Sequence, residues 1–284
     1  MAAIVAGFTS PITAPARPPL PVRRAGIITN QGAAMSVSPK PITADRFGAV
    51  LFDMDGVLTS TATIHSSCWK TMFDDFLRRR AAEREEAFRP FDIATDYKRY
   101  VDGKLRYDGV RSFLASRGIA LAEGAPDDPP TVETVCGLGN RKDELVKAAI
   151  AQGKVESYPD SVALVRRLLE QEIRTAVVSA SNNCEEVLRA AGILDLFEVR
   201  VDGVVASQLG LPGKPAPDTF LEAARGLGVI PARAVVVEDA IAGIQAARAG
   251  GFGLIVGVAR DGSSEALRTE GADMVVTDLA ELLN

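Results

Sequence analysis

The chain has 284 residues, of which 47% are hydrophobic and 24% charged, and its net charge at pH 7 is −5. This composition is ordinary for a globular protein of one large or two modest domains. The mild acidity gives no electrostatic basis for binding nucleic acid or an anionic membrane, and no apolar run approaches the roughly 20 residues of a membrane helix. A phosphorylated ligand would therefore need positive charge supplied locally.

The cysteine and histidine content narrows the chemistry further. The three cysteines, Cys68, Cys136 and Cys184, are widely spaced and odd in number, which fits neither a disulfide scaffold nor a zinc site. We therefore expect reduced thiols and a cytoplasmic location. The single histidine, His65, excludes a histidine-rich zinc site.

Residues 1–45 differ from the rest of the chain. They are rich in Pro, Ala and Gly, carry four basic residues and contain no acidic residue before Asp45. Because no helical or strand period is sustained, we expect a disordered N-terminal extension. Two alternatives stay open: translation starts at Met35, or the segment directs the protein to an organelle.

The first predicted strand covers residues 49–52, a short apolar run that leads directly into Asp53 and Asp55. Side chains alternate along an extended chain, so the two carboxylates leave the strand on the same side, and Gly56 permits a sharp turn. Two interpretations follow. The aspartates either cap a strand-to-helix turn or hold a divalent cation at the carboxyl edge of a sheet.

Residues 60–152 follow a helical pattern. Apolar and aromatic residues recur at spacings of three and four from His65 to Leu77, and similar patterns cover residues 110–114 and 142–150. A Pro-rich loop at 123–130 separates the last two. No strand pattern interrupts this stretch, so we expect a helical domain inserted after the first strand.

From residue 153 onward, strands and helices alternate. The pattern predicts strands at 173–179, 234–239, 254–258 and 274–276, and helices at 162–169, 185–191, 219–227 and 240–249. Such alternation implies a parallel sheet with helices on both faces. The predicted fold is therefore an α/β, doubly wound, Rossmann-like core of residues 46–59 and 153–284, with the helical cap inserted at 60–152.

Polar residues stand at the ends of three predicted strands: Asp53 and Asp55, then Ser179, then Glu238 and Asp239. Lys214 lies in a nearby Gly-Lys-Pro loop. Taken singly, each has a structural interpretation as a helix cap or a surface charge. Because the carboxyl ends of parallel strands meet at one edge of a sheet, the set together predicts a single pocket.

This order of motifs resembles the haloacid dehalogenase superfamily of phosphotransferases. Asp53-Met-Asp-Gly-Val matches the first motif, Ser179 the second, Lys214 the third and Glu238-Asp239 the fourth. The resemblance implies that Asp53 attacks phosphorus and that Asp55 is the general acid and base. It also implies Mg²⁺ held by Asp53, the main-chain carbonyl of Asp55, Glu238 and Asp239, with Lys214 and Ser179 balancing the remaining phosphoryl oxygens.

Within the superfamily, the chain resembles the β-phosphoglucomutase subgroup. The resemblance implies that His65, Trp69 and Lys142 contact the sugar, although Trp69 also suits core packing and Lys142 by default is solvent-exposed. It implies a second phosphate site with Arg106 from a cap loop that contains Gly103. The core loop Ser179-Ala180-Ser181-Asn182-Asn183 would complete that site through Ser181 and Asn183.

Two departures weaken the assignment to glucose phosphate: Ser60 replaces the subgroup's usual aspartate and Asn182 a frequent lysine. We expect a monomeric phosphohexomutase that interconverts β-glucose 1-phosphate and glucose 6-phosphate. A Mg²⁺-dependent sugar-phosphate phosphatase is the alternative, and a non-catalytic binding module on the same fold is the third. Nucleic acid and membrane are not expected partners.

Overall fold

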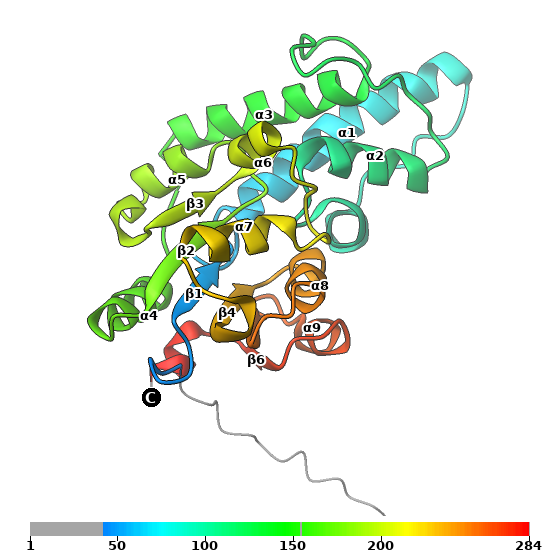
Figure 1. Ribbon diagram of the computed structural model, residues 1–284. Helices are drawn as coiled ribbons and strands as arrows, with labels where there is room; N and C mark the ends of the chain where they lie inside the picture. Colours follow the sequence, from blue (N-terminus) through cyan, green and yellow to red (C-terminus); the bar gives the residue numbers. More distant parts are fainter. Residues whose placement is uncertain (1–41, 154, 284) are drawn as a thin grey trace, which may run out of the picture. The chain divides into compact units, whose positions relative to one another are not determined.

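The computed structural model describes residues 42–153 and 155–283. Six strands form one sheet in the order β3-β2-β1-β4-β5-β6, and every neighbouring pair is parallel (Figure 1). The strands are β1 (Ala49–Phe52), β2 (Arg174–Val178), β3 (Val199–Val201), β4 (Ala234–Glu238), β5 (Leu254–Val258) and β6 (Met274–Val276). The predicted α/β class with a doubly wound parallel sheet is confirmed.

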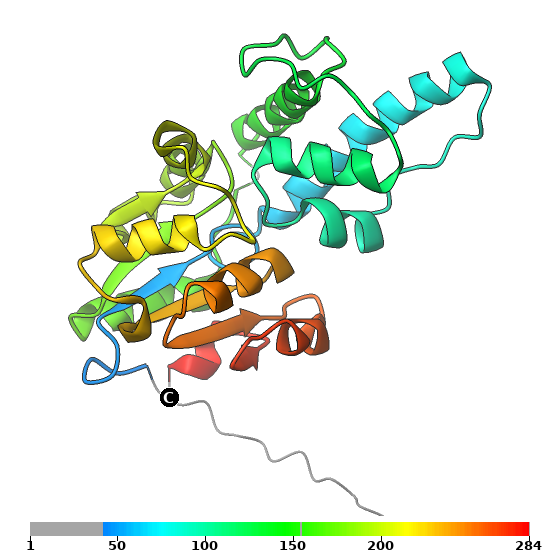
Figure 2. The same cartoon turned by 45° about the vertical axis from the view of Figure 1, so that its right-hand side comes forward.

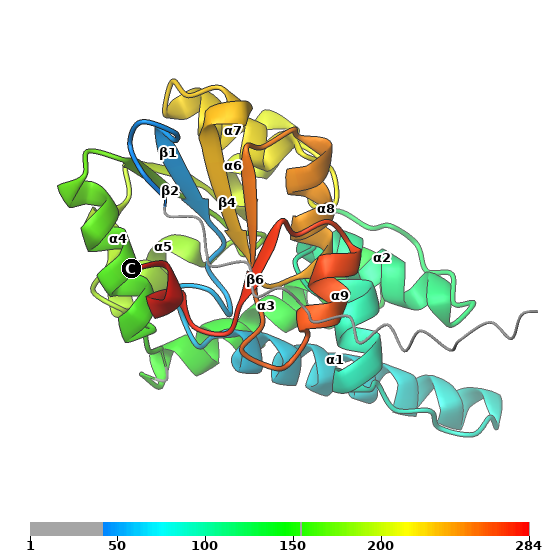
Figure 3. The same ribbon diagram turned by 90° about the horizontal axis from the view of Figure 1, so that it is seen from below.

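Helices cover both faces of the sheet (Figure 3). In β1, Val50 and Phe52 pack in an apolar cluster with α4 (Pro159–Glu170) and α5 (Cys184–Ala190). Ala49 and Leu51 pack on the other face with α7 (Asp218–Gly226) and α8 (Ile241–Ala249). Burial on both faces explains why the central strands are apolar throughout rather than alternating. The helices of this domain are α4 (Pro159–Glu170), α5 (Cys184–Ala190), α6 (Gly203–Leu209), α7 (Asp218–Gly226), α8 (Ile241–Ala249) and α9 (Ser264–Thr269), with short 3₁₀ turns at Leu194–Leu196, Pro231–Arg233 and Leu279–Leu282.

Between β1 and α4 the described chain forms four helical segments (Figure 2), and these have an apolar core of their own. The core is aromatic: Phe73 stacks on Trp69 and Phe91, at ring-centre distances of 5.3 and 5.2 Å, and Phe113 lies 4.2 Å from Phe73. The segments are α1 (Ala62–Arg84), a π-helix η1 (Ile93–Val101), α2 (Arg106–Ser116) and α3 (Val135–Ala151). None of the helices in the described part of the chain is both long and apolar enough to cross a bilayer.

Several short elements were not predicted from the sequence. β3 lies at the edge of the sheet and has the sequence Val-Arg-Val, so it lacks the continuous apolar run that marks the buried strands. η1 was missed because a π-helix does not follow the 3.6-residue period. Most of the expected N-terminal extension lies outside the described residues; Ile42, at its predicted end, is buried in the same cluster as Phe47.

The strand register places the polar residues. Phe52 of β1 pairs with Val177 of β2 on one side and with Val237 of β4 on the other. Asp53 directly follows Phe52, Glu238 directly follows Val237, and Ser179 comes two residues after Val177. These polar residues therefore lie close together at the carboxyl edge of the sheet. Open parallel sheets bind their ligands at this edge.

Candidate active site

Three carboxylates meet at the carboxyl edge of the sheet. One oxygen from each of Asp53, Glu238 and Asp239 lies within 4.8 Å of the others. The position of Gly56, at φ +87°, leaves space for this group, because a Cβ there would lie 2.0 Å from Oδ2 of Asp239. Carboxylate oxygens are the ligands that Mg²⁺ prefers, so these residues fit a divalent cation.

Lys214 is bound to two of these carboxylates. Its Nζ donates to Oδ1 of Asp53 at 2.5 Å and to Oε2 of Glu238 at 2.7 Å, and all three side chains are buried. Burial raises the pKa of Asp53 to about 6 and that of Glu238 to about 7, with the Lys214 charge acting against both shifts. Burial also acts to lower the pKa of Lys214, but the two carboxylates outweigh it and the pKa rises. The ammonium thus offsets part of the acidic charge of the site.

The side chain of Asp55 has different partners from the other acids. Its Oδ1 accepts a hydrogen bond from the Thr61 hydroxyl and lies 3.5 Å from Nε2 of His65. Burial raises the pKa of Asp55, against the effect of the Thr61 hydrogen bond. A raised pKa suits a carboxyl group for proton transfer near neutral pH. Sequence reasoning missed Thr61, whose only signal was its place just before α1.

His65, Lys142 and Trp69 form one contact group where α1 packs on α3. The Nζ of Lys142 lies 2.8 Å from Nδ1 of His65 and 5.1 Å from the centre of the Trp69 ring. The assumption that Lys142 is solvent-exposed is wrong, because the residue is only 7% exposed. Burial lowers the pKa of Lys142 to about 8 and takes that of His65 well below its usual value. Trp69 both packs on Phe73 and lines the pocket.

The residues expected to form a second phosphate site meet on a carboxylate that sequence reasoning missed. Nη1 of Arg106 lies 3.0 Å from Oδ2 of Asp143, and the side-chain amide of Asn183 donates to Oδ1 at 2.8 Å. The Ser181 hydroxyl accepts from the backbone N–H of Asn183 at 3.2 Å. Asp143 directly follows Lys142, and that adjacency was the only signal for it in the sequence.

The cap loop after η1 approaches the core beside the acidic group. Gly103 has φ +69°, and a Cβ there would lie 3.0 Å from Cβ of Ala240, the residue after Asp239. The preceding residue, Asp102, lines the pocket. Burial raises the pKa of Asp102 to about 7, against the effect of a hydrogen bond from Tyr97. Neither Asp102 nor Tyr97 was identified from the sequence.

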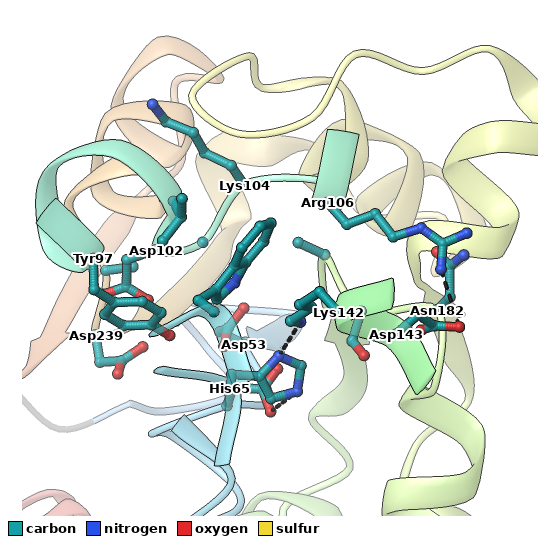
Figure 4. A pocket seen from close by; sticks show the side chains of 17 residues that line it. Asp53, His65, Tyr97, Asp102, Lys104, Arg106, Lys142, Asp143, Asn182 and Asp239 are labelled. Atoms are coloured by element: carbon teal, nitrogen blue, oxygen red, sulfur yellow. Dashed lines mark hydrogen bonds and ion pairs between the residues drawn. The ribbon is translucent and has the colours of Figure 1, made fainter. Parts of the chain in front are cut away.

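Most of these side chains line one partly enclosed cavity of about 50 Å³. Figure 4 shows Asp239, Tyr97 and Asp102 at one end, Asp53, His65 and Lys142 in the middle, and Arg106, Asp143 and Asn182 at the other end. Ten of the predicted site residues line the cavity: Asp53, Asp55, His65, Trp69, Gly103, Arg106, Lys142, Ala180, Ser181 and Asp239. The other four, Ser179, Asn183, Lys214 and Glu238, are buried and do not line it.

Ser179 is close to the cavity without lining it. Its hydroxyl accepts a hydrogen bond from the backbone N–H of Ser181 at 3.1 Å, and its own backbone N–H donates to Val201 of β3 at 3.0 Å. These contacts hold the loop after β2, from which Ala180 and Ser181 reach the cavity wall.

Comparison with known proteins agrees with the four motifs. The sequence profile of the haloacid dehalogenase-like hydrolases matches residues 47–251. A β-phosphoglucomutase of Mycobacterium tuberculosis (strain CDC 1551) is 48% identical over 242 residues, which cover 84% of this chain and 92% of that protein. The β-phosphoglucomutase of Bacillus subtilis is 32% identical over 82% of this chain and 91% of its own length.

A solved structure agrees with these sequence matches. The crystal structure of a β-phosphoglucomutase from Clostridium difficile is similar with a TM-score of 0.65 and 25% identity, over 83% of this chain and 93% of that one. Fold, motif order and sequence similarity therefore lead to one conclusion: the chain is an enzyme of the haloacid dehalogenase superfamily and belongs to its β-phosphoglucomutase-like subgroup.

Proposed function

We propose that the protein is a phosphohexomutase of the β-phosphoglucomutase type, which interconverts β-D-glucose 1-phosphate and glucose 6-phosphate. One observation carries the proposal. The side chains of Asp53, Asp55 and Arg106 line the same cavity. This supports a pocket in which Asp53 would be the nucleophile and Arg106 would bind a second phosphate. The relatives named β-phosphoglucomutase support the choice of substrate.

In the first half-reaction, a carboxylate oxygen of Asp53 would attack the phosphorus of a sugar bisphosphate, and the bond from phosphorus to the sugar oxygen would break. The carboxyl group of Asp55 would give its proton to that sugar oxygen. When the 1-phosphoryl group is transferred, the glucose 6-phosphate formed would leave and β-glucose 1-phosphate would bind in its place. In the second half-reaction, Asp55 would take the proton from the free 6-hydroxyl of this second sugar. That oxygen would then attack the aspartyl-phosphate, release Asp53 and complete the exchange.

Asp53, Glu238 and Asp239 would hold Mg²⁺, together with the main-chain carbonyl of Asp55. When bound, the ion supplies positive charge that stabilises the phosphoryl oxygens during transfer. Lys214 would shift from its carboxylate partners toward a phosphoryl oxygen, and Ser179 would support the loop that meets the same group.

The remaining residues of the pocket would orient the sugar and its second phosphate. His65, Trp69 and Lys142 would contact the sugar, and Gly103 would let the cap loop close on the core. Arg106, Ser181 and Asn183, with Ala180 in the same loop, would bind the phosphate that is not transferred. A small sugar phosphate is the only partner in this proposal, which describes a monomeric, cytoplasmic enzyme.

A Mg²⁺-dependent sugar-phosphate phosphatase is the second candidate, and one observation favours it. The cavity of about 50 Å³ has room for water but not for a hexose phosphate, and Arg106 is already paired with Asp143. Water would then replace the sugar hydroxyl in the attack on the aspartyl-phosphate. The two activities share the first half-reaction and differ in the second.

A product assay separates the two candidates. The enzyme is given β-glucose 1-phosphate, Mg²⁺ and a trace of glucose 1,6-bisphosphate, and glucose 6-phosphate and free phosphate are followed together. Glucose 6-phosphate without free phosphate supports the mutase, whereas free phosphate as the main product supports the phosphatase. The Asp53→Asn variant is the blank, since it lacks the nucleophile. No turnover with either readout would contradict both candidates.

A further inference from the structure

Asp143 holds together three groups from different parts of the fold. Its Oδ2 lies 3.0 Å from Nη1 of Arg106 at the start of α2 and 3.0 Å from Nζ of Lys147 one turn further along α3. Its Oδ1 accepts a hydrogen bond from Asn183, which follows β2 in the core, at 2.8 Å. One carboxylate therefore bridges the helical cap and the sheet domain.

The surroundings of this carboxylate favour its ionised form. Burial acts to raise its pKa, but the Lys147 hydrogen bond, the Arg106 charge and the Asn183 hydrogen bond outweigh it and lower the pKa. The side chain of Asp143 is 13% exposed and that of Arg106 is 19% exposed. Because the pair is largely screened from water, a second anion at Arg106 would be strongly repelled while Asp143 stays in place.

Arg106 also contacts Tyr107, and these contacts would remain after Asp143 moves away. Its Nη2 donates to the Tyr107 hydroxyl at 3.1 Å, and its guanidinium lies 4.9 Å from the centre of the Tyr107 ring. The Tyr107 hydroxyl in turn donates to Asn140 at 2.9 Å. In addition, Nε of Arg106 is buried and has no hydrogen-bond partner among the described residues. A ligand oxygen would satisfy that donor.

Asp143 can keep its ion pair with Lys147 when it separates from Arg106. Lys147 follows it by four residues on α3, and the Lys147 side chain is 64% exposed, so it can move with the carboxylate. The geometry thus permits an exchange in which Arg106 and Asn183 pass from Asp143 to an incoming anion.

We propose that Asp143 is a specificity-determining residue, a displaceable counter-ion that occupies the second anion position of the pocket and holds Arg106 and Asn183 until a ligand with a second phosphate replaces it. The inference rests on the proposed function only in placing that phosphate at Arg106. A ligand without a second dianionic group leaves the Asp143 contacts intact, so the bridge between cap and core opens for doubly anionic sugar ligands in preference to small phosphate esters.

The Asp143→Asn variant tests the inference. Asn has nearly the same shape and keeps one oxygen, which can accept from Asn183, but its NH2 group cannot accept from Arg106 and it lacks the charge that opposes the incoming phosphate. We expect the affinity for glucose 1,6-bisphosphate to increase on the order of tenfold. Asp143→Glu keeps the charge and should show no such increase.

Binding is measured in the Asp53→Asn background, which prevents turnover. The chain has one tryptophan, Trp69, and it lines the pocket, so its fluorescence reports ligand binding. Calorimetric titration with Mg²⁺ is done on proteins that keep Asp53, because Asp53 is a proposed ligand of the ion. It serves as the control for the inner site and for folding, and we expect it to be unchanged by Asp143→Asn. Asp75→Asn is the matched control variant, because Asp75 pairs with Arg79 and Arg141 on the cap outside the pocket.

The outcomes separate this inference from the proposed function. Tighter bisphosphate binding by Asp143→Asn, with no change in Asp75→Asn or Asp143→Glu, supports the inference. If Arg106→Ala weakens bisphosphate binding but Asp143→Asn leaves it equal or weaker, Asp143 is not a displaceable counter-ion and only this inference fails. If Arg106→Ala has no effect on bisphosphate binding, there is no second phosphate site and the proposed mutase function fails as well.

Discussion

The Nζ of Lys142 lies 2.8 Å from Nδ1 of His65, and this contact determines which nitrogen of the imidazole carries the proton. An ammonium can only donate, so Nδ1 accepts and the neutral ring carries its proton on Nε2. Nε2 is 3.5 Å from Oδ1 of Asp55. A buried lysine thus orients a histidine N–H toward the proposed general acid and base.

This relationship predicts an alkaline limit to activity. Lys142 is charged below its pKa of about 8 and loses the charge as the pH rises through that value. We therefore expect kcat/KM to fall above about pH 8, as the donor to His65 is lost. In Lys142→Ala, kcat/KM should be lower by roughly 100-fold, and this alkaline limb should be absent. A pH profile of kcat/KM for both proteins is the measurement, and an unchanged limb in the variant would assign it to another group.

The hydrogen bond from the Thr61 hydroxyl to Asp55 predicts that removing this hydroxyl slows the proposed proton transfer. Thr61→Val keeps the shape of the side chain but removes the donor to Asp55. We expect kcat to fall roughly tenfold, a part of the 10²–10⁴-fold that acid–base catalysis supplies, with little change in KM. Thr63→Val is the control, since the Thr63 hydroxyl donates only to the backbone of Ser60. Equal effects of the two substitutions would contradict the role given to Thr61.

The ion pairs of Lys214 with Asp53 and Glu238 predict that the free energy of unfolding of a Lys214 variant depends on Mg²⁺. Lys214→Met leaves Asp53 and Glu238 buried without their ammonium partner, which costs about 3–5 kcal/mol in the free energy of unfolding. Saturating Mg²⁺ should restore part of this loss, because the ion binds the folded state. Urea unfolding with and without Mg²⁺ gives both values. Lys98→Met, which breaks the exposed pair with Asp261, should cost about 1 kcal/mol or less and respond little to Mg²⁺.

The cap loop predicts different effects for two glycines with the same backbone conformation. Gly103 and Gly118 have φ of +69° and +65°, so Ala at either position costs about 1 kcal/mol of stability through backbone strain. At Gly103 the added Cβ meets the core, 3.0 Å from Ala240. At Gly118 it has no atom of the described residues within 4 Å apart from its chain neighbours. We therefore expect Gly103→Ala alone to reduce kcat/KM. Thermal melting and steady-state kinetics on both variants test this, and equal kinetics would mean that the loop does not control access to the site.

Much of the fold and of the inner site follows from the sequence itself. The apolar runs at residues 49–52 and 234–237 predict strands that are buried on both faces, and the structure has them so. Asp53, Ser179 and Glu238 end neighbouring strands or follow them, so predicting a parallel sheet also predicts that they lie close together. Local pattern and the geometry of parallel strands were sufficient here.

The tertiary structure decided how charges and hydrogen bonds pair between segments. Lys142 stands in a charged stretch that favours solvent exposure, yet the packing of α3 on α1 buries it against His65. Asp102, Asp143 and Thr61 were not predicted as site residues, and they contact partners 5 to 40 positions away. Such pairings depend on distances of a few ångströms across separate elements, and one-dimensional periodicity carries no information about those distances.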